Sequence, residues 1–236
     1  MSRDSTDATS RMTYERFVEF ERLMKIYAGS SSQRCNPTPI GFCALGLTFF
    51  VFGMHNAGAT VPIGTANGTG MGLALFYGGL ILLLAGLFEL REGNNFHALI
   101  FCSYAGFWLS RASLNISAFN FISNTYGTDS TVIDKGFGIY YLAWTIFTLG
   151  MLISSIRINI FSIVFFSSLL ITYILLTASF FLLFDYNLLR AAGAFGILTA
   201  AIAWYGGFAS LHKKGENSYF NLPTCSLAPK SSNQSI

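Results

Sequence analysis

The sequence predicts an all-α membrane protein with six transmembrane helices, and composition and patterning carry this prediction. Of its 236 residues, 53% are hydrophobic and only 11% are charged, whereas a soluble domain carries roughly 25% charged residues. Mean hydropathy is +0.52. Long apolar runs alternate with very short polar joints. A hydrocarbon core of ~30 Å needs ~20 mostly apolar residues per helix, and helices satisfy their own backbone there.

Six apolar runs of roughly this length follow one another between the polar ends of the chain. Their expected bounds are Ile40–Val61, Met71–Phe88, Phe96–Ser117, Phe137–Ile156, Ile158–Phe184 and Leu189–Leu211. The third run is the least regular because Arg111 and Asn115 interrupt it. We therefore expect one membrane domain, residues 36–211, between cytoplasmic tails of residues 1–35 and 212–236.

Lysine and arginine residues gather on one side of the predicted membrane, and cytoplasmic segments keep an excess of such residues. Eleven of the 14 lie in the two tails or in the joints after the second and fourth runs. They are Arg3, Arg11, Arg16, Arg22, Lys25, Arg34, Arg91, Arg157, Lys213, Lys214 and Lys230. Lys135 and Arg190 fall on the opposite side. Both termini are therefore expected in the cytoplasm, and the protein is expected in the plasma membrane.

The first 35 residues are polar and lack a continuous apolar core, so the first run is expected to act as its own insertion signal. Within them, the pattern predicts a helix over Thr13–Tyr27. One face of this helix carries the apolar residues Phe17, Phe20, Met24 and Tyr27. It is expected either to lie at the membrane surface or to pack against the cytoplasmic ends of the bundle.

Several classes of function find no support in the sequence. The four cysteines lack metal-ligand spacing, so neither a metal nor a cofactor is expected. The nucleophile elbow, the zinc-protease motif and the phosphate-binding loop are missing, so an enzyme is not expected. The net charge of +3 follows from the cytoplasmic bias and suits anionic lipid heads rather than nucleic acid.

The most informative motif, Asn36-Pro37-Thr38-Pro39-Ile40-Gly41, opens the first run. Asn36 is expected to cap the helix through its side-chain oxygen, and Pro37 suits the first helical position because no amide is needed there. Pro39 still falls in the first turn. Taken alone, the motif marks only the start of a helix.

Five later segments accompany this motif. They are His55-Asn56-Ala57-Gly58, Phe76-Tyr77-Gly78-Gly79, Ala85-Gly86-Leu87-Phe88-Glu89, Gly93-Asn94-Asn95-Phe96 and Ser103-Tyr104-Ala105-Gly106-Phe107-Trp108. In this order the set resembles the acetate uptake transporter family, which includes bacterial succinate-acetate permeases and fungal acetate transporters. The resemblance covers roughly residues 36–211. It implies protomers that are each a six-helix bundle around its own pore, assembled as a hexamer. It further implies transport of acetate and related short carboxylates, coupled to protons or channel-like.

The resemblance also implies a constriction in the pore, at the positions that match Leu45, Tyr104 and Leu169. Bacterial relatives carry Phe where this chain carries Leu45, so the implied constriction has another shape and admits a larger acid. Counted from the expected helix starts, the three residues lie at compatible depths. A bare carboxylate crosses such an apolar layer at a cost of a few to more than ten kcal/mol, which an accompanying proton or the Tyr104 hydroxyl would lower.

Four polar residues in the runs have two interpretations each. His55, near the outer end of the first run, either solvates the interface or meets an incoming anion, and Asn56 beside it can pair between helices. Glu89 matches a family Glu and is our preferred intramembrane carboxylate; otherwise it pairs with Arg91 or supports a helix start. Arg111 is expected to reach the outer surface, with attraction of an anion as its second role.

Two questions stay open at this level. Small residues at Ala192, Gly196 and Ala200 predict a packing surface on the last run, either within a protomer or between protomers. Descriptions of some relatives keep two other functions in view, an acetate-responsive membrane sensor and an ammonium-linked exporter.

Overall fold

The computed structural model describes residues 14–23, 36–212, 218, 222, 223 and 227. They fall into two units, one within Met1–Asn36 and the other within Pro37–Ile236. In the first unit, residues 14–23 form a helix with exposed side chains. This stretch lies inside the helix predicted over Thr13–Tyr27, of which Met24 and Tyr27 lie outside the described residues.

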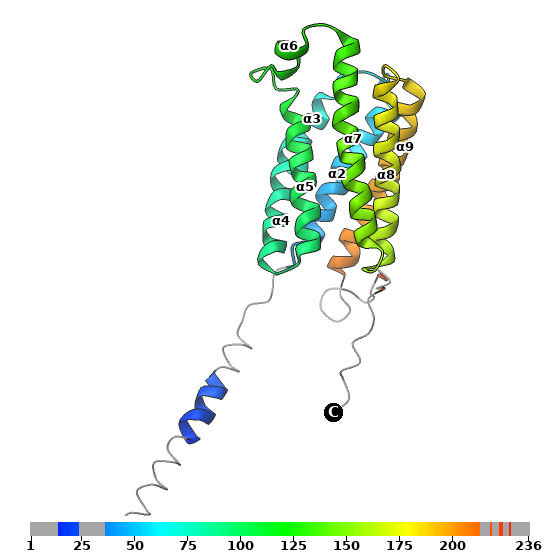
Figure 1. Ribbon diagram of the computed structural model, residues 1–236. Coiled ribbons are helices and arrows are strands. Elements are labelled where there is room, and N and C mark those ends of the chain that lie inside the picture. Colours follow the sequence, from blue (N-terminus) through cyan, green and yellow to red (C-terminus); the bar gives the residue numbers. More distant parts are fainter. Residues whose placement is uncertain (1–13, 24–35, 213–217, 219–221, 224–226, 228–236) are drawn as a thin grey trace, which may run out of the picture. The chain divides into compact units, whose positions relative to one another are not determined.

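The second unit is a bundle of long helices (Figure 1). They are α2 (Thr38–Ala57), α3 (Gly68–Leu75), the π-helix η1 (Phe76–Ile81), α4 (Leu82–Arg91), α5 (Asn95–Ser113), α6 (Phe121–Tyr126), α7 (Ser130–Ser155), α8 (Ile160–Phe181) and α9 (Tyr186–Leu211). α3, η1 and α4 follow one another without a break and together form the second predicted span. The turn of π-helix lies on the Phe-Tyr-Gly-Gly segment, and such turns gather at functional sites.

Five helical segments in the described part of the chain are long and apolar enough to cross a membrane. They are Thr38–Ala57, Gly68–Arg91, Ser130–Ser155, Ile160–Phe181 and Tyr186–Leu211. The third predicted span, α5, is not among them. Its 19 residues include the polar side chains Asn95, His97 and Arg111. α5 nevertheless packs along α4 and buries Phe101 and Tyr104 in the core.

The start of α2 differs from our prediction, in which Asn36 caps the helix. Pro37 holds the cap position, and no side-chain hydrogen bond closes it because proline offers no acceptor there. Pro39 lies in the first turn, as the motif predicts. Gly41 has a packing role in addition, because an added methyl group would collide with the ring of Phe101.

Later helices do carry side-chain caps. The caps are Asn67 on α3, Asn94 on α5, Asp129 on α7, Asn159 on α8 and Asp185 on α9. Each side-chain oxygen accepts a bond from a backbone amide of the first turn that has no partner within the helix. These caps fix where each helix leaves its connecting loop.

The closest helix pair in the bundle is α2 with α9, which run in opposite directions. A methyl group on Gly193 would collide with the backbone nitrogen of Ala57, and one on Gly207 would lie 3.0 Å from the Cys43 sulfur. A methyl group on Gly196 would lie 3.4 Å from the Cα of Gly53. The small-residue surface predicted on the last run therefore packs within the protomer, since glycine lets helix backbones approach closely.

Contacts with aromatic rings fix the directions of α5 and α8 relative to α2. Gly41 and Phe49 of α2 approach Phe101 and Trp108 of α5, which lie in the same chain order. Phe42 of α2 likewise contacts the first half of α8. α2, α5 and α8 therefore run in one direction, with successive turns side by side. This alignment determines which residues of the three helices lie at the same depth in the bundle.

We expect Gly193→Ala to destabilise the bundle by about 1–3 kcal/mol, because the facing atoms are backbone and cannot rotate away. Thermal unfolding of the purified protein in detergent measures the loss as a midpoint lowered by roughly 2–4 °C per kcal/mol. Gly150→Ala on α7 is the matched control, since no atom lies within 4 Å of its added methyl group. Equal midpoints for the two variants would contradict close α2–α9 packing.

Candidate functional site

A cavity of about 180 Å³ lies at the end of the bundle where α2 and α5 finish. We call it the vestibule. Its polar lining consists of His55, Asn56, Thr65, Asn67, Arg111, Asn115 and Tyr141. His55 and Asn56 therefore lie where the sequence predicts, close to the end of the first span. The ring nitrogen Nε2 of His55 is buried, with no hydrogen-bond partner among the described residues.

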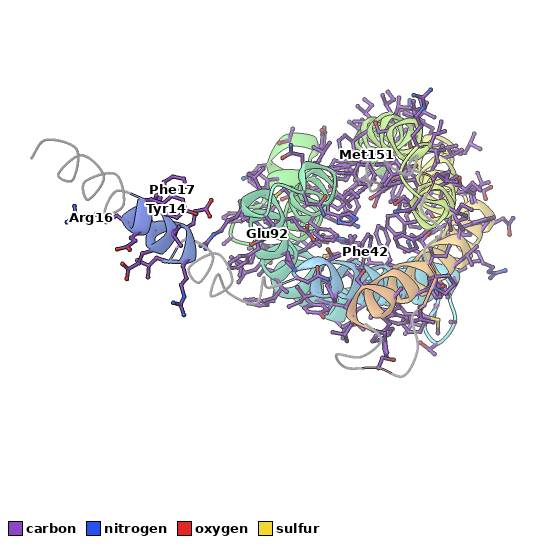
Figure 2. The ribbon with its side chains drawn as sticks, turned by 90° about the horizontal axis from the view of Figure 1, so that it is seen from below. Tyr14, Arg16, Phe17, Phe42, Glu92 and Met151 are labelled. Atoms are coloured by element: carbon purple, nitrogen blue, oxygen red, sulfur yellow. The ribbon has the colours of Figure 1, made fainter. Side chains whose placement is uncertain are left out.

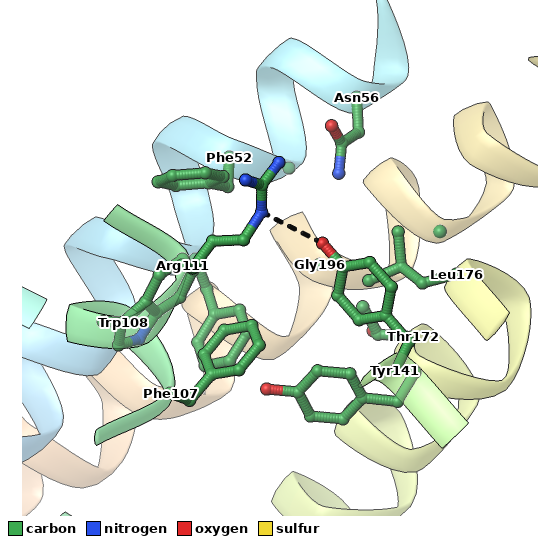
Figure 3. A pocket seen from close by; sticks show the side chains of 13 residues that line it. Phe52, Asn56, Phe107, Trp108, Arg111, Tyr141, Thr172, Leu176 and Gly196 are labelled. Atoms are coloured by element: carbon green, nitrogen blue, oxygen red, sulfur yellow. Dashed lines mark hydrogen bonds between the residues drawn. The ribbon is translucent and has the colours of Figure 1, made fainter. Parts of the chain in front are cut away.

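A second cavity, of about 30 Å³, adjoins the vestibule deeper in the bundle (Figure 3). We call it the chamber. Both cavities are lined by Phe52, Asn56, Arg111, Tyr141 and Leu176. One water needs roughly 10–15 Å³ of cavity volume, so the chamber has room for about two waters. A solute that enters the vestibule meets a narrow, partly polar dead end.

Arg111 is the charged group of both cavities. Its Nε donates a hydrogen bond to the Tyr141 hydroxyl at 3.3 Å, and its guanidinium lies 5.1 Å from the centre of the Phe137 ring. Asn56 faces the same space (Figure 3). In the part of the chain that the structure describes, no carboxylate forms an ion pair with Arg111. Its position fits the second role that we considered, attraction of an anion, rather than reaching the outer surface.

Two residues that line the chamber each have a buried polar atom with no hydrogen-bond partner in the described structure. These atoms are the Tyr173 hydroxyl and the Trp108 indole nitrogen, on side chains that are 0% and 2% exposed. Buried polar groups nearly always have partners, and an unpaired one points to a water or ligand that belongs there. Tyr173 and Trp108 therefore each leave one buried polar atom unpaired on a residue that lines the chamber.

The three residues predicted as the constriction lie beyond the chamber, and all three are 0% exposed. The Tyr104 hydroxyl exchanges a hydrogen bond of 2.9 Å with Thr148 of α7. Its ring stacks on that of Tyr173, with centroids 6.5 Å apart. Leu169 lies one helical turn before Tyr173 on α8, and Leu45 lies one turn before Phe49 of the chamber on α2.

A phenylalanine layer follows one turn further on. Phe42 packs edge-on against Phe101 at 5.1 Å and against Phe165 at 5.9 Å between ring centroids. Phe42 lies in the interior of the bundle in the view along its axis (Figure 2). The three predicted constriction residues lie three or four positions after these rings, on helices that run the same way. Helix geometry therefore brings them to one depth.

A polar cluster lies beyond the phenylalanine layer, where His97 contacts Phe42 and Phe101. Glu89 is 2% exposed and accepts hydrogen bonds from the Thr38 hydroxyl and from the Asn94 amide, the latter at 2.7 Å. The His97 Nδ1 lies 3.8 Å from its Oε1. Because Asn94 caps α5, Glu89 does support a helix start, and Arg91 is not among its partners.

Sequence reasoning missed Tyr141, Tyr173 and His97. Each lies within an apolar run, where an aromatic or a single histidine is more often a packing residue. The signal that could have found them is a hydroxyl or ring nitrogen in the middle of an apolar run, because buried Tyr and His side chains need hydrogen-bond partners. Only the arrangement in space shows that the first two line the chamber and that the third faces Glu89.

The long apolar helices of the bundle define a multi-pass helical membrane protein. The family model for the GPR1/FUN34/yaaH family matches residues 23–229, and the chain belongs to this family.

Similar proteins are found among fungi. Accumulation of dyads protein 2 of Saccharomyces cerevisiae is 37% identical over 80% of this chain and 67% of its own length. Ammonia transport outward protein 2 of the same yeast is 34% identical, with the same shares covered. Acetate permease A of Emericella nidulans is 34% identical over 80% of this chain and 65% of its own length. The chain thus spans about two thirds of each relative.

A solved structure has the same fold. The bacterial acetate channel SatP matches with a TM-score of 0.66 and 25% identity, over 80% of this chain and 99% of the channel.

Proposed function

We propose that this protein transports acetate and related short-chain carboxylates across a membrane. The observation that carries the proposal is the vestibule and chamber, in which the Arg111 cation and unpaired donors face a dead end closed by buried apolar side chains. A small anion with one apolar end fits this order of groups. The acetate permease and the acetate channel among the similar proteins support the same substrate class, and their descriptions favour a transporter over an enzyme.

The proposed constriction is the set Leu45, Tyr104 and Leu169. Complete burial supports it, and so does the register that sets these residues at one depth. A bare carboxylate would pay a large desolvation cost in such a layer, so the solute is proposed to cross as the neutral acid or together with a proton. The Tyr104 hydroxyl already has a partner in Thr148, so opening requires that contact to rearrange.

The architecture is proposed to have six transmembrane helices, with α5 as the sixth. Burial of Tyr104 and packing of α5 along α4 support this, since a helix inside the bundle tolerates polar residues. Cytoplasmic termini are supported by Arg91, the last residue of α4, and by Arg157, just after α7, which lie at the same end of the bundle. By family resemblance the protomers are proposed to form hexamers in the plasma membrane, each with its own pathway.

A second candidate function is export linked to ammonium, because two similar yeast proteins carry the name ammonia transport outward protein. The buried Glu89 carboxylate is the group that would meet a cation. An acetate-responsive sensor is the other alternative.

In liposomes containing the purified protein, we expect labelled acetate to enter faster than in protein-free liposomes. Methylammonium flux without acetate flux would favour the exporter, and acetate binding without flux would favour the sensor.

We expect Arg111→Gln to raise the acetate concentration for half-maximal uptake by about tenfold, because a hydrogen bond to a charged group contributes roughly 1.5–3 kcal/mol. The measurement is the concentration dependence of initial uptake in liposomes. Arg190→Gln is the matched control, since it removes the same charge from an exposed position that lines neither cavity. Equal effects of the two substitutions would mean that only overall charge matters.

The constriction is tested by Leu45→Phe and Tyr104→Ala, assayed with acetate, lactate and succinate. The larger ring should slow lactate more than acetate, and removal of the tyrosine should admit the larger acids. Leu47→Phe, on the exposed face of α2, controls for added bulk. If both variants are expressed and keep wild-type rates and selectivity, the assigned constriction is wrong.

A further inference from the structure

The cluster of Thr38, Glu89, Asn94 and His97 contains a buried carboxylate beside an imidazole. The side chain of Glu89 is 3% exposed and that of His97 is 20% exposed, with 3.8 Å between Oε1 and Nδ1. Two groups that both take up protons thus lie just beyond hydrogen-bond distance. One of them is sealed in the protein, and the other has partial access to solvent.

The hydrogen bonds of Asn94 favour one protonation state of Glu89 and His97. Its Oδ1 accepts from the His97 backbone amide at 3.3 Å, which caps α5 and fixes the orientation of the side-chain amide. Its Nδ2 then lies 2.7 Å from the Glu89 Oε2 and 2.7 Å from the His97 Nδ1. An amide nitrogen only donates, so both contacts are satisfied when the imidazole is neutral and accepts at Nδ1.

The same geometry leaves room for one more proton. A proton on the His97 Nδ1 would break the bond from Asn94 and turn the 3.8 Å separation from Glu89 into an attractive ion pair. A proton on the Glu89 Oε1 would instead reverse the bond with Thr38, whose hydroxyl can accept as well as donate. The cluster can therefore hold a proton at Glu89 when the Thr38 bond reverses, and at His97 when the Asn94 amide turns away from Nδ1.

The cluster adjoins the path of the solute. The His97 ring stacks on Phe101, with centroids 5.8 Å apart and an angle of 15°. Its edge meets Phe42 at 5.5 Å. Both rings belong to the phenylalanine layer. A solute that crosses this layer therefore arrives beside His97 and Glu89.

We propose that Glu89 and His97 form the proton-binding site through which carboxylate transport is coupled to protons. The proposal rests on the proposed transport function. The O–H bond of the neutral acid breaks at this end of the path, the proton passes to the Glu89 carboxylate, and the substrate leaves as the anion. The proton then moves to the neutral His97 imidazole and from there to water. Inward and outward transport use the same steps in opposite order.

Other charged groups near the pair are few in the described bundle. The exposed side chains of Arg91, the last residue of α4, and of Glu92, its C-cap, follow Glu89, and Glu92 is close enough to Glu89 to interact with it electrostatically. α2 contributes the neutral Thr38, and α5 contributes Asn94 and His97 itself. Phe42 and Phe101 form the apolar wall. The response to pH is therefore assigned to the pair rather than to a wider network.

The test compares two kinds of acetate movement in liposomes that contain the purified full-length protein. Exchange of labelled for unlabelled acetate at equal pH needs no net release of a proton, whereas net uptake does. Rates in protein-free liposomes are subtracted, because acetic acid crosses lipid by itself. For Glu89→Gln and His97→Gln we expect the ratio of net uptake to exchange to fall by about tenfold or more. We also expect net uptake to lose its dependence on pH between about pH 5 and about pH 8.

The outcomes separate this proposal from the function on which it rests. Asp134→Asn, which removes a carboxylate of α7 at the opposite end of the bundle, should keep the wild-type ratio. If both test variants keep the wild-type ratio and pH profile, the cluster only holds the α4–α5 turn and the proposal is overturned, while transport stands. If the wild-type protein shows neither exchange nor net uptake, the transport function itself fails. Should Glu89→Gln not fold, His97→Gln, at the more exposed position, decides.

Discussion

The structure depends on one constraint, the lack of water in the hydrocarbon core to satisfy polar groups. Helices meet this constraint for the backbone. Between helices it is met by pairs of hydroxyl groups, since Tyr104 pairs with Thr148, and Ser168 of α8 pairs with Thr199 of α9 at 2.8 Å. Such pairs hold neighbouring helices in one register. An unpaired polar atom in this setting, such as the Tyr173 hydroxyl, is therefore a candidate hydrogen-bond partner for a solute.

The common direction of α2, α5 and α8 sets the order of the proposed path. Successive turns of the three helices form layers: first the chamber, then the proposed constriction, then the phenylalanine layer. Close packing of α2 on α9 through glycines keeps the wall on that side rigid. A rigid wall matters because a constriction made of loosely held side chains would not distinguish acids that differ by one carbon.

The sequence predicted the helical membrane fold and most span bounds within a few residues, because runs such as Ile158–Phe184 leave no alternative in lipid. Its misses have physical causes. Pro37 rather than Asn36 is the cap because the helix begins at Thr38. Local sequence patterns predict the first residue of a helix only to within a residue or two. α5 is less apolar than the other long helices because it carries Asn95, His97 and Arg111. The three predicted constriction residues came from family resemblance, since burial alone is equally typical of core packing.

Partners across helices could not be predicted from the sequence at all. Nothing in the spacing of His97 and Glu89 shows that Asn94 joins them, because the link depends on how the α4–α5 turn folds back. The same holds for Arg111, whose neighbour Tyr141 is 30 positions away. Long-range contacts of this kind decide whether a charged residue in an apolar run destabilises the fold or forms part of a functional site.

The distribution of charge along the path has a further consequence. Arg111 and His97 are 14 residues apart on α5, about 21 Å along the helix axis, with no charged side chain between them on this helix. Arg111 favours the anionic form of a carboxylate and so opposes the protonation that lets it enter the apolar layers. A site that held the anion too strongly would stop transport, since conduction requires binding weak enough to release. The bond from Arg111 to Tyr141 and the cation–π contact with Phe137 already occupy part of its binding capacity, which keeps attraction of the anion moderate.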